Sequence, residues 1–479
     1  MREALGGELQ SLQQRERAVL SNRRFFVLWL AQLFSQVAQN AILFTLLVIV
    51  LTKTNSTTDT SILVLSYVVP SLLFGMVAGV LVDRWRKRDI LIATNAFRSF
   101  AAVAFLLSSD HVELILAVNI AFSAVGQFFA TAEVATVPSL VPKSQLIAAN
   151  SLVSLAWTAA QFGGMVFFAP IVIKTFGADA LFIATALFFA TAALLVRWLP
   201  RNVGEREVRE AQEAQEERFI QTAPRELGKA LRLLRSDPAS CLAMAQLTLS
   251  SSLVLLFAVL VPRFMQEVLD VRPDDAVYIF APTGIGAIFG LRLLPWLAGK
   301  IGKDRVVAFG LVGLAACLIA LGLVQNIADA LQRTEALNPF GQERLGGLSL
   351  LVALTMFFAG PLGLTYAMVN APAQTVLHER APPEMRGRVF GAQMALASVA
   401  AIIPLLLVGA VADIYGVSFV LFNIAVAVAG MSGLSLYFLE RQNRAIAAAQ
   451  AAGDHASTGG GDRPSEGSAA SIDTGEGVG

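Results

Sequence analysis

The chain has 479 residues, of which 56% are apolar and 15% are charged, and its mean hydropathy is +0.64. Soluble domains ordinarily carry about 25% charged residues, so this composition excludes an ordinary soluble globular protein and predicts a lipid bilayer as surrounding. The net charge of +1 gives no reason to expect a nucleic-acid partner, and a count of two cysteines excludes a disulfide framework or a cysteine-rich metal site.

The first segment, residues 1–24, is interpreted as a polar cytoplasmic leader, and no cleavable signal peptide is expected in it. Twelve apolar runs follow, each close to the length of about 20 residues that a helix needs to cross a membrane. The first six cover residues 25–51, 61–82, 89–108, 112–137, 150–173 and 178–199. The second six cover residues 240–262, 277–299, 305–325, 347–371, 389–412 and 417–439.

These spans are predicted to be helices, because lipid offers backbone N–H and C=O groups no hydrogen-bond partner. We therefore expect an all-α polytopic membrane protein whose twelve transmembrane helices form two six-helix pseudo-repeat bundles, residues 25–199 and 240–439. Residues 200–239 are interpreted as a cytoplasmic linker, with either an amphipathic helix at the membrane surface or an ordinary linker helix. Residues 440–479, rich in Ala, Gly and Ser, are predicted to be a disordered cytoplasmic tail.

The orientation follows from the distribution of Lys and Arg between the two membrane faces. The face that holds both termini carries 28 of these residues and the opposite face carries six. Because basic residues accumulate in cytoplasmic loops, we expect a multi-pass protein of the cell membrane (inner or plasma) with both termini in the cytoplasm.

An internal repeat supports two halves of common design. GVLVDRWRKR (residues 79–88) follows the second span, and PWLAGKIGKDR (residues 295–305) follows the eighth. A second, Pro-containing pair of loops follows the fourth and tenth spans, at residues 140–146 and 380–386. Parallel repeats of this kind form a substrate site near the membrane midplane, between the halves.

The segment Gly79-x-x-x-Asp83-Arg84-x-x-Lys87-Arg88 resembles the signature loop of the major facilitator superfamily, although Arg86 replaces the usual glycine. The form of this loop, together with VPSLVPKSQLIAANSL and the run ERAPPEMRGRVFG followed by Pro404, Gly409, Asp413 and Gly416, is similar to the branch of macrolide exporters and the enterobactin exporter. The resemblance covers residues 25–439 and implies a transporter. The fifth-helix motif of drug antiporters keeps only its glycine pair, Gly163-Gly164.

The resemblance implies a cytoplasmic gate in which Asp83 meets the start of helix eleven near Arg388 and the outward-facing state is held by ion pairs. The gating candidates are Asp83, Arg84, Lys87, Arg88 and Arg388. The alternative is a solvated loop whose basic residues set only the topology.

Charged residues buried within spans, away from the ends, are costly, at about 2.5–3.5 kcal/mol each, and three qualify here: Arg98, Glu133 and Arg292. Glu133 and Arg98 are the candidates for proton coupling, because an unpaired carboxyl group in apolar surroundings takes up a proton readily. A structural Arg–Glu pair, or a Glu133 side chain that reaches the interface, is the alternative. Arg292 contacts either substrate or the interface.

Polar amides also lie within the spans. A stripe on the first span comprises Gln32, Gln36, Gln39 and Asn40, whose spacing places them on one helix face that turns toward a cavity or another helix. The candidates for lining a substrate cavity are this stripe and Gln127, Gln161, Gln246, Arg292 and Asn370. Bridging between helices is the alternative for each of them.

The function expected from these features is secondary active efflux of amphipathic, drug-like small molecules by alternating access, with protons as the coupling ion. The alternatives are an exporter or flippase of a larger anionic or lipid-like molecule, such as a siderophore or lysophospholipid, and a transporter-like sensor. No phosphate-binding loop, zinc motif or titratable cluster indicates an enzyme. We expect no cofactor or metal, and a monomer.

Overall fold

The computed structural model describes residues 19–142, 145–200, 238–272, 275–333, 349–380 and 386–458. Within these residues the regular secondary structure is helical, and 12 helices are long and apolar enough to cross a membrane. Each of the twelve predicted spans overlaps one of them, which confirms the all-α prediction.

The N-terminal bundle holds the first six spans. Its helices are α2 (Arg23–Thr54), α3 (Thr57–Arg84), α4 (Lys87–Leu107), α5 (Val112–Leu140), α6 (Leu146–Phe162), α7 (Ala169–Phe176) and α8 (Ala178–Val196). The fifth span consists of α6, the π-helical segment η2 (Gly163–Phe168) and α7. At the glycine pair, a Cβ on Gly164 would lie 2.5 Å from the backbone oxygen of Val37, so glycine permits the close approach of η2 to α2.

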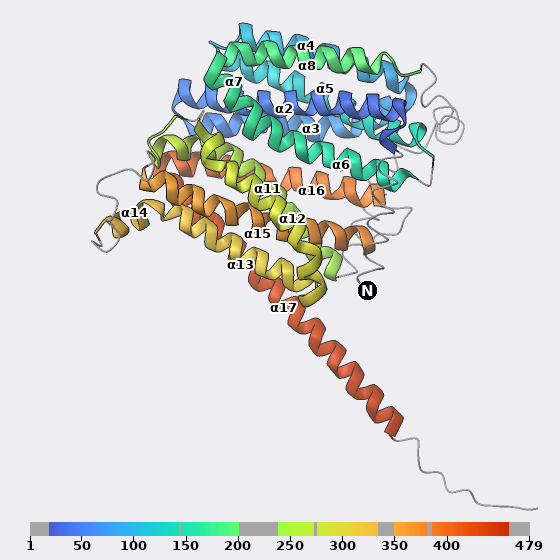
Figure 1. The fold of residues 1–479 in the computed structure, drawn as a ribbon, viewed down its shortest axis with the longest axis vertical. Helices are drawn as coiled ribbons and strands as arrows, with labels where there is room; N and C mark the ends of the chain where they lie inside the picture. The colour runs from blue at the N-terminus through green and yellow to red at the C-terminus, as the bar shows by residue number, and fades with distance from the viewer. Residues whose placement is uncertain are drawn as a thin grey trace, which may run out of the picture.

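The C-terminal bundle holds the second six spans and one short additional helix. Its helices are α11 (Pro238–Glu267), α12 (Ala276–Ile301), α13 (Lys303–Gly322), α14 (Val324–Arg333), α15 (Leu350–Arg380), α16 (Arg386–Tyr415) and α17 (Val417–Thr458). α12 packs closely on α15, because Gly286 and Gly363 bring the two backbones together. Figure 1 shows this bundle lying beneath α2–α8, with α17 extending away from it.

α17 corrects one prediction about the tail. It continues to Thr458, whereas the twelfth span was expected to end at residue 439 and disorder to follow. The segment after Arg441 is rich in alanine, the residue with the highest helix propensity, which favours continuation of the helix. The leader before residue 19, most of the predicted linker and residues 459–479 lie outside the described residues.

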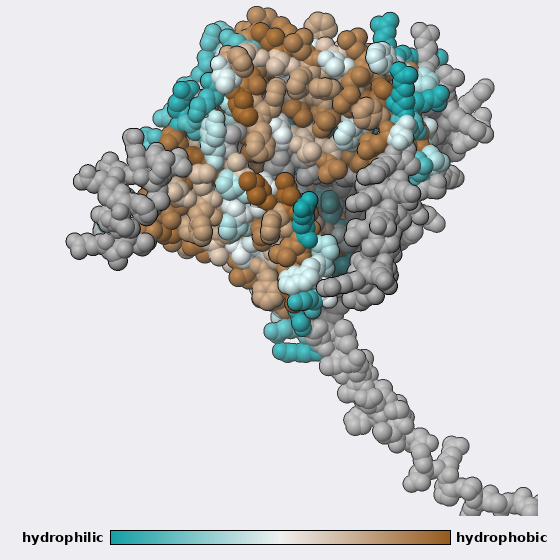
Figure 2. Space-filling model, in the orientation of Figure 1, coloured by the Kyte–Doolittle hydropathy of each residue, from teal (hydrophilic) through white to brown (hydrophobic). Residues whose placement is uncertain are grey.

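The surface agrees with a membrane setting. In Figure 2 apolar residues form a broad band, and polar residues gather toward opposite ends of the N-terminal bundle. We call the two ends by residues that lie there: the Asn55 end, where α2 meets α3, and the Arg88 end, where α4 begins.

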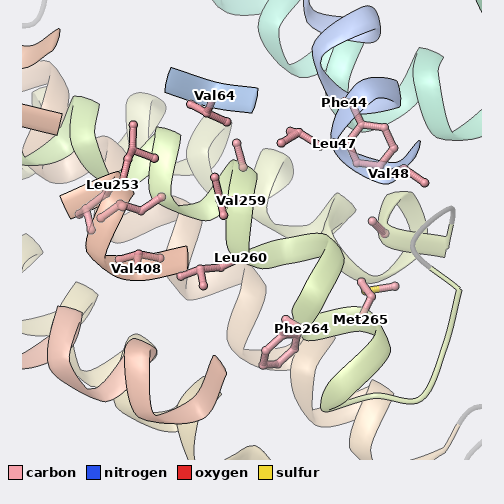
Figure 3. Close-up of a cluster of buried hydrophobic side chains, with 14 of the residues drawn as sticks. Phe44, Leu47, Val48, Val64, Leu253, Val259, Leu260, Phe264, Met265 and Val408 are labelled. Carbon is pink, nitrogen blue, oxygen red and sulfur yellow. The ribbon is translucent and has the colours of Figure 1, made fainter. Parts of the chain in front are cut away.

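The largest buried apolar cluster crosses from one bundle to the other. It joins Phe44, Leu47 and Val48 of α2 and Val64 of α3 to Leu253, Val259 and Leu260 of α11 and Val408 of α16 (Figure 3). The contacts between the bundles are therefore made chiefly by α2 and α3 on one side and α11 and α16 on the other.

Candidate transport site

The predicted polar stripe on α2 is directed largely into the N-terminal bundle. Gln32 donates from Nε2 to the backbone oxygen of Val153 on α6 at 3.3 Å, and Gln39 donates from Nε2 to the Tyr67 hydroxyl on α3 at 2.6 Å. Asn40 donates to the backbone oxygen of Gln36 in its own helix at 2.8 Å. Gln32 and Gln36 are buried, and two members of the stripe, Gln32 and Gln39, bind α2 to neighbouring helices.

Arg98 on α4 is the centre of this polar region. Its side chain is 2% exposed, and its terminal nitrogens donate to Ser35 Oγ at 3.0 Å and to Gln39 Oε1. The guanidinium carbon also lies 5.1 to 5.4 Å from the ring centroids of three phenylalanines, namely Phe122, Phe129 and Phe189. Such cation–π contacts stabilise a cation that has been removed from water.

Glu133 on α5 is 0% exposed, and neither of its carboxyl oxygens has a hydrogen-bond partner among the described residues. The indole of Trp157 on α6 lies beside the carboxyl group without hydrogen-bonding geometry. Arg98 and Glu133 act on each other electrostatically, but no ion pair within 4.0 Å joins these two described side chains. Glu133 is therefore an unpaired acidic group in the interior of a membrane-spanning bundle.

The remaining cavity candidates have separate environments. Gln246 on α11 donates to Ser435 Oγ on α17 at 3.0 Å, so it bridges two helices of one bundle. Asn370 donates to the Tyr366 hydroxyl in its own helix, α15, at 3.2 Å. The other three are less enclosed: Gln127 on α5 is partly buried, while Gln161 on α6 and Arg292 on α12 are exposed.

At the Arg88 end, two of the gating candidates contact their own bundle. Lys87 is buried and donates to the backbone oxygen of Ala135 on α5 at 3.0 Å. Arg88 donates to the backbone oxygen of Arg197, just beyond α8, at 2.6 Å. Asp83 and Arg84 lie at the end of α3 and Arg388 near the start of α16, but their side chains are not among the described ones. Their role in gating stays a prediction.

At the Asn55 end the two bundles are joined by a carboxylate that is not among the predicted site residues. Asp413 of α16 accepts hydrogen bonds from the backbone N–H groups of Thr57 (2.7 Å) and Thr58 (2.9 Å), at the N-terminus of α3. It also accepts from the hydroxyls of Ser56 (3.2 Å) and Thr58 (2.7 Å). Its charge is placed where the N–H groups and dipole of α3 favour an anion.

A hydrogen bond and an ion pair reinforce this end. Arg263 of α11 donates to Asn55 Oδ1 at 2.8 Å, and Lys174 of α7 pairs with Asp275 before α12 at 2.5 Å. Gly409 of α16 lies so close to α3 that a Cβ there would be 2.4 Å from Ser61 Oγ. The Asn55 end is therefore closed by direct contacts between the bundles.

The sequence contained signals for part of this arrangement. Ser35 lies on the same face of α2 as Gln32 and Gln39, at steps of three and four residues, and so belongs to the polar stripe. Tyr67 and Asp413 could not be chosen in this way, because their roles depend on which neighbouring helix faces them.

The fold defines the class of this protein. It is a polytopic membrane protein with two packed helical bundles and a buried charged network. The family model of the Major Facilitator Superfamily matches residues 28–404. The chain belongs to the Major Facilitator Superfamily, which makes it a membrane transporter of this type.

Comparisons with individual proteins agree with that family. The chain is 24% identical over 367 residues to the uncharacterized MFS-type transporter YfiS of Bacillus subtilis, covering 75% of this chain and 79% of the relative. Its fold is similar to that of the nucleoside transporter NupG, with a TM-score of 0.64 at 12% identity over 87% of this chain and 98% of that chain. It is equally similar to the POT family transporter PepTSo, with a TM-score of 0.64 at 12% identity over 88% and 99% of the two chains. These structural similarities concern the fold alone.

Proposed function

We propose that this transporter exports amphipathic, drug-like small molecules by alternating access and that protons, bound at Glu133, are the coupling ion. The observation that carries the coupling is the buried carboxyl group of Glu133, whose two oxygens lack hydrogen-bond partners among the described residues. An ionised carboxylate is strongly disfavoured in an apolar interior without a partner. Glu133 therefore holds a proton in this conformation and releases it when water or a cation reaches the carboxyl group.

Alternating access requires contacts that exist in one state and break in the other. The contacts of Asp413, Arg263 and Lys174 across the bundles fit this requirement, because they lie together at the Asn55 end. If the excess of basic residues marks the cytoplasmic side, the Asn55 end faces outward and both termini are cytoplasmic. The conformation is then closed to the outside, and Asp83 and Arg388 close the opposite side in the other state.

The direction of transport and the class of substrate rest on the resemblance to macrolide and enterobactin exporters. A larger anionic or lipid-like substrate is the second candidate, because two arginines, Arg98 and Arg292, lie within spans. Arg98 gives that candidate little support, because its terminal nitrogens are already bound to Ser35 and Gln39. Arg292, which is exposed on α12, remains the arginine available to an anion.

The experiment begins with a growth-inhibition panel in an efflux-deficient host, comparing cells that express the parent chain with cells that express Glu133→Gln. Compounds against which only the parent protects are then tested in proteoliposomes with an imposed pH gradient. We expect transport that follows the gradient in the parent and loses this dependence in Glu133→Gln. Gradient-driven transport by Glu133→Gln at the parent rate would refute proton coupling at this residue, and binding without flux would indicate a sensor.

A further inference from the structure

Among the buried polar groups of the N-terminal bundle that lack a hydrogen-bond partner, Arg98 and Glu133 supply two of opposite kind. The Nε–H group of Arg98 is a donor without a partner, and both oxygens of Glu133 are acceptors without partners, among the described residues. Buried polar groups are nearly always hydrogen-bonded, and a lost bond costs about 1–3 kcal/mol. A donor and two acceptors left unsatisfied in one bundle need an explanation.

These groups lie at similar depths in the membrane. Arg98 is twelve residues beyond the N-cap Arg86 of α4, and Glu133 is eight residues before the C-cap Val141 of α5. With a rise of about 1.5 Å per residue, they are about 18 and 12 Å from the Arg88 end. Phe129, one turn from Glu133 in α5, is in contact with the guanidinium group. The guanidinium group therefore already lies against α5, one turn from Glu133.

Among the described side chains, no charged group other than Arg98 is placed to pair with the Glu133 carboxylate. Besides Arg98, the groups of α4 and α3 that contact α5 are Lys87, which donates to it, and Tyr67, whose backbone oxygen accepts from Ser123 and whose hydroxyl interacts with Arg98. Lys87 is bound to the backbone of α5, and Tyr67 accepts a hydrogen bond from Gln39. α2 and α6 contribute the Gln32 amide, whose Oε1 is buried without a partner, and the Trp157 indole.

From this arrangement we propose that Arg98 is a two-position switch, bound to Ser35 and Gln39 while Glu133 is protonated and drawn to Glu133 once the carboxyl group has lost its proton. The proton passes to water, a carboxylate remains, and the guanidinium group exchanges neutral acceptors for a charged one. The carboxylate adds a full opposite charge, and the attraction between two opposite charges is much stronger in a low-dielectric interior than in water, which favours the exchange. This proposal rests on proton binding at Glu133. It identifies how a change in the protonation of Glu133 alters the hydrogen bonds of neighbouring helices.

The consequence of the exchange lies on α2 and α3. Gln39 has its Oε1 occupied by Arg98, so its amide must present Nε2 to the Tyr67 hydroxyl. When Arg98 leaves, the Gln39 amide is free to turn and the bond to Tyr67 is released. Because α2 and α3 pack against α11 and α16 of the other bundle, protonation is thereby linked to the helices that form the bundle interface.

The test uses the fluorescence of Trp157, which lies beside Glu133, and needs no substrate. In the full chain in lipid nanodiscs, the other four tryptophans are replaced with phenylalanine: Trp29, Trp85, Trp198 and Trp296. The emission of Trp157 is followed as a function of pH, and Glu133→Gln identifies the transition that belongs to Glu133.

The decisive variant is Gln39→Met, with Gln36→Met, one turn earlier in the same helix, as its matched control. Removing the competing acceptor leaves Arg98 available to the carboxylate, so the midpoint of the Glu133 transition is expected to fall by about one pH unit or more. Gln39→Glu adds a competing charge for Arg98, so the midpoint is expected to rise. Gln36→Met is expected to leave the midpoint where it is in the parent.

A Glu133 transition that is unchanged in both Gln39 variants would overturn the switch while leaving proton binding at Glu133 intact. If Gln39→Met does not fold, Gln39→Glu decides in the same way. The absence of any transition that depends on Glu133 would remove the switch together with the proton site. A shifted transition combined with transport that ignores the pH gradient would support the switch and refute the proposed function.

Discussion

Replacing Asp413 with alanine is expected to favour opening of the Asn55 end. Asp413 lies on α16, yet its carboxylate accepts hydrogen bonds from the first turn of α3 in the other bundle. If the bundles separate at this end, these bonds are lost in the parent as well. The substitution therefore removes stabilisation from the closed state only.

The magnitude follows from the nature of the contact. Replacing a capping side chain with alanine costs about 0.5–2 kcal/mol, and a charge at a helix N-terminus contributes about 0.3–1 kcal/mol where it is exposed. The Asp413 side chain is exposed, and α3 keeps a second cap, because Ser56 Oγ accepts a hydrogen bond from the backbone N–H of Asp59. We therefore expect the loss of Asp413 to cost the closed state about 1 kcal/mol. This free energy corresponds to about a fivefold change in the ratio of open to closed molecules.

The assay is the distribution of distances between two spin labels at the Asn55 end, one on each bundle. Positions 179 on α8 and 329 on α14 are exposed, and both native cysteines are replaced. The control is Asp110→Ala, because Asp110 pairs at this end with Lys53 of its own bundle at 2.8 Å. The hydrogen bond from Lys53 keeps the pKa of Asp110 below its ordinary value, so this control also removes an ionised carboxylate at neutral pH.

We expect the longer distances to gain population in Asp413→Ala and to stay as in the parent in Asp110→Ala. Identical distributions in all three proteins would show that the Asp413 contact does not hold the bundles together. An equal change in both variants would assign the effect to surface charge.

Two further predictions concern packing. Gly286→Ala is expected to destabilise the C-terminal bundle by about 1–3 kcal/mol or more, because the new Cβ would lie 1.9 Å from the Gly360 oxygen. Gly284→Ala is expected to leave the stability unchanged, because its Cβ would meet nothing within 4 Å. Thermal unfolding in detergent distinguishes the two variants. Gln246→Leu is expected to lower stability by about 1 kcal/mol, because Gln246 donates a hydrogen bond to Ser435. The range of transported compounds is expected to stay the same, and an altered range would place Gln246 in the substrate cavity.

The twelve spans could be predicted because hydrocarbon imposes one strong requirement on composition and length. Their ends were less predictable, since they depend on local caps. α2, for example, begins after the N-cap Asn22 and ends at Asn55, which adopts a left-handed conformation with φ of 50°. α14, a short helix between two spans, lay below the length that hydropathy detects.

The candidate site was predictable in its residue types and less so in its partners. Arg98 and Glu133 were visible as charges in apolar runs, and Gln39 as part of a stripe. That Arg98 binds Gln39 instead of pairing with Glu133 depends on how three helices are rotated about their axes, which the periodicity of one helix does not determine. The contact of Asp413 with α3 joins residues more than 350 positions apart, and no local pattern encodes it.

The most direct test of the account is the release of protons when a transported compound binds to the purified protein in weakly buffered solution. If substrate and proton compete through Glu133, saturating compound releases up to about one proton per parent molecule, and Glu133→Gln releases none while still binding the compound. Equal proton release by the two proteins would contradict the assignment of Glu133 as the coupling site.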